Sequence, residues 1–141
     1  MAMESGMRRH ALMILLIAAL HGGFGVALAA TGAHTETSPL LATAGRFLTI
    51  HAAAGAALAG VLLALRPQGR AFALIVFALQ AGVTLFCAGL ALSAFSQQRL
   101  FSYAAPIGGS ITILAWTALA AWTALRLLRT RGADAEDPEG L

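Results

Sequence analysis

Four histidines are the side chains of this sequence best suited to acid–base chemistry or metal binding. They are His10, His21, His34 and His51, and they lie in or beside long apolar stretches. An ionisable side chain is costly to bury within a membrane, so one that lies there is a functional candidate by default. The positions of these histidines allow two kinds of site, a haem site and a metal site.

A haem site would use His21 and His51, because paired histidines from different helices ligate haem in membrane cytochromes. If the apolar stretches form helices over about residues 10–30 and 47–65, His21 lies about nine residues from the outer helix end and His51 about four. At about 1.5 Å per residue, the two rings would differ in depth by about 7 Å. The sequence therefore argues against haem.

A metal site would use His34 and His51 at the outer face, with Glu36 nearby, since imidazole and carboxylate groups both bind divalent metals. In the alternative interpretation, these side chains hydrogen-bond loop backbone and cap helix ends. We favour the alternative and do not assign a cofactor. His34, His51 and His21 remain the candidate ligands for a metal, a haem or a quinone.

Two further polar residues, Gln80 and Thr84, lie four positions apart and therefore on one face of a helix. Polar side chains in membrane helices usually bridge to a neighbouring helix, although these two could also line a path for a small solute. The single cysteine, Cys87, fits a small buried apolar residue. Nothing resembles a nucleophile triad, a phosphate-binding loop or a pair of catalytic carboxylates, so we do not expect an enzyme.

Apolar residues make up 59% of the chain and charged residues 11%, less than half the charged share of soluble domains. The charges separate four charge-free stretches, over about residues 10–30, 47–65, 71–95 and 104–125. A helix of about 20 residues crosses a bilayer and satisfies its own backbone hydrogen bonds. We therefore predict an all-α integral membrane protein. It is a bundle of four transmembrane helices in a single domain over residues 1–141, with a disordered acidic tail over about 132–141.

The arginines predict the orientation of this bundle. Seven of them flank the N-terminus, the second connection and the C-terminus, which share one side after four crossings, and two lie on the other side. Arginine marks the cytoplasmic side of short loops, so both termini are predicted to be cytoplasmic, in a multi-pass protein of the bacterial inner (plasma) membrane. The arginines form no continuous basic face, which argues against nucleic acid as a partner.

The N-terminal stretch also resembles a secretory signal, with Arg8 and Arg9 before an apolar run and Ala27-Leu28-Ala29 at its end. Cleavage there would leave three helices and move the N-terminus outside. The apolar run is longer than the usual core of a signal and continues through glycines. We therefore favour its retention as a membrane helix.

Small residues recur at helical spacing and predict close packing, because lipid gives membrane helices no hydrophobic drive to associate. They are Ala18, Gly22, Gly25 and Ala29 in the first stretch, Ala52, Ala56 and Gly60 in the second, and Gly108 and Gly109 in the fourth. They exceed the needs of one bundle. We therefore expect a structural or accessory protein of the lipid bilayer that forms a homo-oligomer or joins a larger membrane complex. The alternatives are a ligand-binding or redox module that uses the outer histidines, and small-solute transport.

Several short motifs, in their order along the chain, carry a family resemblance. They are Gly32-Ala33-His34, Phe47-Leu48 before His51-Ala52, Thr84-Leu85-Phe86-Cys87, and Ala105-Pro106-Ile107-Gly108-Gly109 before Ala115-Trp116. Together they resemble the small membrane proteins called YgdD-like in bacteria and transmembrane-protein-256-like in animals, a group catalogued as a domain of unknown function. The last motif, with its tryptophan, is the most specific.

The resemblance covers about residues 11–125. It implies four membrane helices and an uncleaved first segment, and it implies no activity. It also places His34 and His51 in family motifs, which favours the outer pair as a site. The chain departs from the family at Thr43-Ala44-Gly45-Arg46, where an aromatic-rich lead-in to the second helix is expected.

Overall fold

The computed structural model describes residues 2–34, 39–65, 69–96 and 103–136, without the side chains of residues 2–4, 34, 96 and 132–136. The described residues form the helices α1 (Ala2–His34), α2 (Pro39–Leu65), α3 (Gly69–Ser96) and α4 (Ala104–Glu136). Each of the four is long and apolar enough to cross a membrane. The predicted all-α, multi-pass membrane bundle is therefore confirmed.

The helices extend beyond the charge-free stretches that predicted them. α1 continues to His34 and α2 begins at Pro39, so both helices reach into residues 31–46, which lie between the first two predicted stretches. The Thr43 hydroxyl, for example, donates to the Pro39 carbonyl oxygen one turn back, 2.8 Å away. A hydroxyl that is satisfied within its own helix does not end that helix. Proline is tolerated at a first helical position because its missing N–H has no helical partner there.

α4 also continues past the predicted end of its span, to Glu136. Residues 132–136 belong to the segment that was predicted to be a disordered tail, so that part of the prediction is wrong. Ala133, Ala135 and Glu136 are good helix formers, and a helix that leaves the membrane does not need apolar side chains to continue. Residues 137–141 lie outside the described part of the chain.

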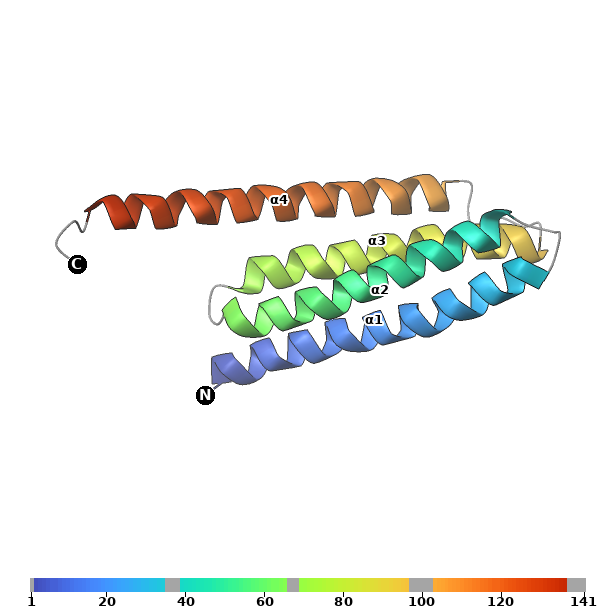
Figure 1. The fold of residues 1–141 in the computed structure, drawn as a ribbon, viewed down its shortest axis with the longest axis horizontal. Helices are drawn as coiled ribbons and strands as arrows, with labels where there is room; N and C mark the ends of the chain where they lie inside the picture. Colours follow the sequence, from blue (N-terminus) through green and yellow to red (C-terminus); the bar gives the residue numbers. More distant parts are fainter. Residues whose placement is uncertain (1, 35–38, 66–68, 97–102, 137–141) are drawn as a thin grey trace.

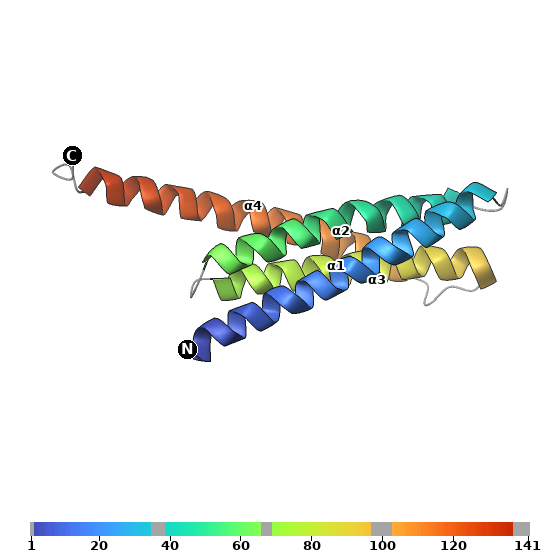
Figure 2. The same cartoon turned by 60° about the horizontal axis from the view of Figure 1, so that its bottom comes forward.

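Each helix runs antiparallel to the next, and α3 lies at the centre (Figure 1). α3 packs against α1, α2 and α4, while α1 packs mainly against α2. Among the described residues, the backbone of α4 packs against α3 alone. Figure 2 shows the C-terminal half of α4 diverging from the other helices. The fold is thus a compact group of three helices with α4 attached to one side of α3.

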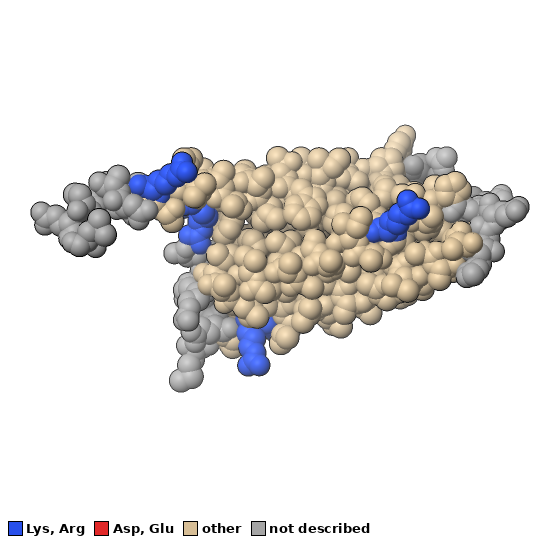
Figure 3. Space-filling view, in the orientation of Figure 1, with Lys and Arg blue, Asp and Glu red and all other residues tan. Residues whose placement is uncertain are grey.

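Basic side chains lie near the two ends of the molecule, and the visible surface between them carries none (Figure 3). The first turns of α1 and α3 and the last turns of α2 and α4 lie at one end, which we call the terminal end (Figure 1). The opposite end is the loop end. This separation of charge from the apolar middle is the surface expected of a membrane-spanning bundle.

α1 and α2 approach each other most closely at Gly25 and Gly45. A Cβ on Gly25 would lie 2.9 Å from the Thr49 backbone nitrogen and 3.0 Å from the Gly45 carbonyl oxygen. A Cβ on Gly45 would lie 3.0 Å from the Cα of Ala29. These distances leave no room for a side chain, so the two backbones touch. The small residues predicted on α1 all lie on this side of the helix, and they are Ala18, Gly22, Gly25 and Ala29.

The matching small residues of α2 differ from those predicted. Ala52 lies against α1, but Ala56 and Gly60 are exposed. Gly55 and Ala59 are buried in their place. A constant spacing of four residues drifts about 40° around a helix at each step, whereas alternating spacings of three and four stay on one face.

α3 and α4 meet in the same way, at Gly82 and Gly108. A Cβ on Gly82 would lie 2.8 Å from the Thr112 backbone nitrogen and 2.9 Å from the Gly108 carbonyl oxygen, and a Cβ on Gly108 would collide with the Phe86 backbone nitrogen. Gly109 lies at the edge of this contact, because a Cβ there would be 3.7 Å from the Phe86 ring. The two glycines predicted in the fourth stretch therefore pack within the chain.

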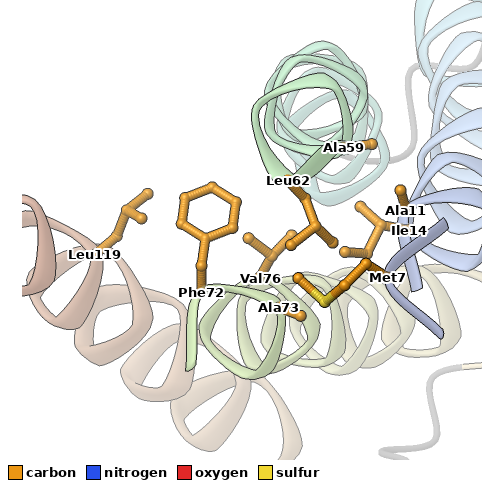
Figure 4. Packing of buried hydrophobic residues seen from close by; sticks show 9 residues of the cluster. All are labelled: Met7, Ala11, Ile14, Ala59, Leu62, Phe72, Ala73, Val76 and Leu119. Carbon is orange, nitrogen blue, oxygen red and sulfur yellow. The ribbon is translucent and has the colours of Figure 1, made fainter. Parts of the chain in front are cut away.

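At the terminal end, side chains from all four helices form one apolar cluster (Figure 4). Its members are Met7, Ala11, Ile14, Ala59, Leu62, Phe72, Ala73, Val76 and Leu119. Phe72 of α3 lies between Leu62 of α2 and Leu119 of α4. Trp122 of α4 also packs against Phe72, with ring centroids 5.2 Å apart and the rings tilted by 56°. This cluster joins the middle of α4 to α3.

Gly25→Ala tests the contact between α1 and α2, and Gly23→Ala is its matched control. A Cβ on Gly23 would meet no atom of the described structure within 4 Å. Alanine is favoured over glycine in a helix by about 1 kcal/mol, so Gly23→Ala should leave stability unchanged or raise it. Gly25→Ala should lower the free energy of unfolding by about 1–3 kcal/mol, because it forces the backbones apart. Denaturant unfolding in detergent measures both, and equal effects would contradict the contact.

Candidate functional site

His21 and His51 lie at the same level, near the middle of the bundle. His21 is thirteen residues before the last residue of α1, and His51 is twelve residues after the first residue of α2. A Cβ on Gly22 would lie 3.6 Å from the Cβ of Ala52, which places the residues that follow the two histidines side by side. The predicted depth difference of about 7 Å is therefore wrong. It was counted from the ends of the apolar stretches, and the helices end elsewhere.

His21 joins α1 to α3. Its side chain is 5% exposed, and its Nε2 lies 2.9 Å from Thr84 Oγ1. The Thr84 hydroxyl donates its proton to the Gln80 carbonyl oxygen, 2.8 Å away. Its oxygen can therefore only accept from His21, so the neutral His21 ring carries its proton on Nε2. The other ring nitrogen, Nδ1, is then an acceptor.

Gln80 lies beside the His21 ring and is 1% exposed. Gly55 leaves space for it, because a Cβ there would collide with the Gln80 amide nitrogen. Within the described part of the chain, Gln80 Nε2, Gln80 Oε1 and His21 Nδ1 have no hydrogen-bond partner. Leaving such a buried group unpaired costs about 1–3 kcal/mol. These three neighbouring atoms thus form one buried polar group that would gain from a further partner.

His51 has a complete set of hydrogen bonds. Its Nδ1 lies 2.8 Å from the Phe47 carbonyl oxygen, and the Trp116 indole N–H donates to its Nε2 over 3.3 Å. A carbonyl oxygen only accepts, so Nδ1 carries the proton and the Nε2 lone pair receives the indole N–H. Both nitrogens of the neutral ring are occupied. The second of these bonds joins α2 to α4.

The structure does not bring the predicted outer pair together. His34 is the last residue of α1, whereas His51 lies about 18 Å along α2 from Pro39. The His34 side chain and all of Glu36 lie outside the described residues. Within the described part of the chain, no group of three or more histidine, cysteine, aspartate or glutamate residues could hold a metal ion.

His21 and His51 do not offer two ligands for a haem either. The two rings together leave one nitrogen available, Nδ1 of His21, since both nitrogens of His51 are in hydrogen bonds. A haem held by two histidines needs one nitrogen from each. Because the two rings lie at the same level, a difference in depth no longer argues against haem. The hydrogen bonds of His51 argue against it instead.

Sequence reasoning identified the polar residues but not all of their partners. The spacing of Gln80 and Thr84 predicts a bridge to another helix, and Thr84 does bridge to His21. Trp116 was not identified as the partner of His51, because a contact across 65 positions leaves no periodic signal. The available signal was its place in the most specific motif of the resemblance. Cys87 is buried, as predicted.

These features define a class of protein: a multi-pass membrane bundle whose helices are joined at mid-depth by buried histidine side chains. The chain belongs to the family described as "Protein of unknown function (DUF423)", which matches residues 27–109. The match confirms the predicted membership in a family of small membrane proteins of unknown function. It includes His51 and Thr84, whereas His21 and Trp116 lie outside it. No curated protein and no solved structure matches the chain.

Trp116→Phe tests the bridge between α2 and α4. The change removes the indole donor and leaves the Nε2 lone pair of His51 without it, so the free energy of unfolding should fall by about 1 kcal/mol. Trp122→Phe is the matched control, because it also removes an indole from α4 and keeps a ring against Phe72. Circular dichroism during unfolding in detergent measures both variants. A loss for Trp116→Phe no larger than for Trp122→Phe would show that the bridge does not stabilise the bundle.

Proposed function

We propose that the protein is a structural or accessory membrane protein, and not an enzyme, that associates with a second copy of itself through α4. The surface that supports this proposal consists of Thr117, Ala120, Ala121 and Ala124, and we call it the free face of α4. All four residues are exposed. Their spacing of three, one and three residues places them on one side of the helix.

The free face lies opposite the side by which α4 is attached. Gly108, Thr112 and Ala115 are buried against α3, and the free face is about half a turn of the helix away from them. In the apolar part of α4, 17% of the residues are buried, compared with 44% in α3. α4 therefore has the largest surface available to a neighbour in the membrane.

Small side chains on this surface favour another helix over lipid as the neighbour. Within the chain, helices join where small residues let backbones touch, as at Gly25 with Gly45 and Gly82 with Gly108. Lipid tails gain nothing from a small residue, whereas a second helix can come closer. α2 carries a second exposed group of small residues at the same spacing, and they are Ala53, Ala56, Ala57 and Gly60.

A second copy of the chain can bring a helix with small residues against the free face. Two copies inserted in the same orientation, and related by a twofold axis along the membrane normal, place α4 beside its own copy. Each copy then contributes the same four small residues. The exposed group on α2 remains available for a further neighbour, which is how such a pair would join a larger complex.

The orientation and membrane of the protein form part of the same proposal. Arginines concentrate at the terminal end, where Arg8, Arg70 and Arg126 come from three different helices. The positive-inside rule then supports cytoplasmic termini, in the inner membrane of a bacterium. The alternative, a ligand-binding or redox role for the outer histidines, is less favoured, since both ring nitrogens of His51 are in hydrogen bonds.

Ala121→Leu combined with Ala124→Leu tests the association. Two leucines prevent the close approach of a second α4, so the dissociation constant of the pair should rise about tenfold or more. Ala118→Leu is the matched control: Ala118 is exposed but lies on another side of the helix. Native mass spectrometry of the full chain in mild detergent measures the outcome. We expect a dimer for the wild type and the control, and a monomer for the double variant.

Two outcomes would contradict the association itself, and a third would contradict its partner. One is a monomeric wild-type protein, and the other is a dimer that persists in the double variant. A complex that contains a different polypeptide and only one copy of this chain would overturn the second copy as the occupant of the free face.

A further inference from the structure

We infer that His21 is a proton-binding site in the middle of the bundle, with Gln80 as the hydrogen-bond partner of both its neutral and its protonated ring. The hydrogen bonds of Thr84 determine the tautomer of the neutral His21 ring. Its hydroxyl proton goes to the Gln80 carbonyl oxygen, so its oxygen receives the Nε2–H of His21. The incoming proton therefore binds at Nδ1, the nitrogen that has no partner in the described part of the chain.

The Gln80 side chain suits both states of the ring. It carries a donor, Nε2, and an acceptor, Oε1, and neither has a partner among the described residues. With the amide nitrogen toward the ring, Gln80 donates to the lone pair of neutral Nδ1. After half a turn of the amide, Oε1 accepts the Nδ1–H of the protonated ring. An apolar residue of similar size would serve neither state.

The packing around Gln80 keeps its amide at this site. A Cβ on Gly55 would collide with the Gln80 amide nitrogen and would lie 3.0 Å from the Cβ of Ala18. The amide thus occupies space that only a glycine leaves free, between α2 and α1. Ala18 is one turn before His21 on the same face of α1, so the amide is held beside the imidazole.

His51 lies at the same level but cannot take part in this way, because both of its nitrogens are in hydrogen bonds. It is the titratable group that α2 presents to His21, and charges on the two rings would repel each other. α3 carries a further titratable side chain, Cys87, and its thiol lies 3.7 Å from the Ala44 carbonyl oxygen. Among the described residues, α4 does not pack against α1. The arrangement therefore binds one proton, at His21.

Proton uptake is a simple transfer. Hydronium gives up a proton, an N–H bond forms at Nδ1 of His21, and water is left, with no change in oxidation state. The charge of the chain rises by one. No aspartate or glutamate lies within the four membrane spans, so the dipoles of Gln80 and Thr84 are what stabilise the new charge. The transfer reverses when the pH rises.

Nitrogen NMR of the full chain, labelled at histidine and held in lipid nanodiscs, tests the inference. Imidazole nitrogen shifts distinguish the two neutral tautomers from the protonated ring, and a His21→Asn variant assigns the His21 signals. As the pH falls from neutrality, the His21 signals should change from those of the Nε2–H tautomer to those of the protonated ring. A His21 ring that stays neutral down to the lowest pH at which the protein remains folded would overturn the inference.

Gln80→Met tests the role of the amide. The ratio of protonated to neutral His21 at the lowest pH should fall about tenfold, because the acceptor for Nδ1–H is gone. The Nε2–H tautomer at high pH should persist, which shows that the Thr84 bond and the fold remain. If the ratio does not change while that tautomer is retained, Gln80 is not the partner. The titration of the wild-type protein decides the proton site even if this variant does not fold.

Discussion

The contact between Gly25 and Gly45 determines where the rest of the bundle can lie. Lipid gives helices no hydrophobic reason to associate, so they must gain from close packing of their own atoms. Here the backbones of α1 and α2 come so close that a Cβ on either glycine would lie 3.0 Å or less from backbone atoms of the other helix. A shift of one helix along the other would bring larger residues into this contact. The glycines therefore fix the register of α1 against α2, and with it the level of every polar group on these two helices.

That register gathers the buried polar side chains into one layer. His21 and His51 lie level with each other, and each bonds to a different helix: His21 to Thr84 of α3, and His51 to Trp116 of α4. The two rings differ in their hydrogen bonds. His51 is a satisfied structural bridge, whereas His21 keeps one nitrogen and an adjacent amide, that of Gln80, without partners among the described residues. A buried polar group without a partner is costly in a membrane, so His21 is the ring with a candidate functional role.

The sequence predicted the four spans because charge-free stretches of helical length admit few other structures in a bilayer. It misplaced their ends, because residues such as Thr43 bond to their own helix and let it continue through polar sequence. That error alone separated His21 from His51 in depth and made His34 and His51 seem close. The packing residues of α1 lie where they were expected. On α2, the prediction followed a strict spacing of four residues, whereas the small residues that are buried lie on the face that includes Gly55. The partners of the histidines depend on the register between helices, which periodicity within one helix does not contain.

Disulfide cross-linking between α1 and α2 tests that register most directly. Cys87→Ala removes the single native cysteine, so pairs of new cysteines report one contact at a time. Gly22→Cys with Ala52→Cys should cross-link most readily in membranes, because the Cβ positions lie 3.6 Å apart, close to the roughly 3.8 Å of a disulfide. The predicted result is a maximum at this pair and little reaction for Gly22→Cys with Gly55→Cys. A maximum at the second pair would shift α2 by about one turn, place His21 and His51 at different depths, and contradict the account.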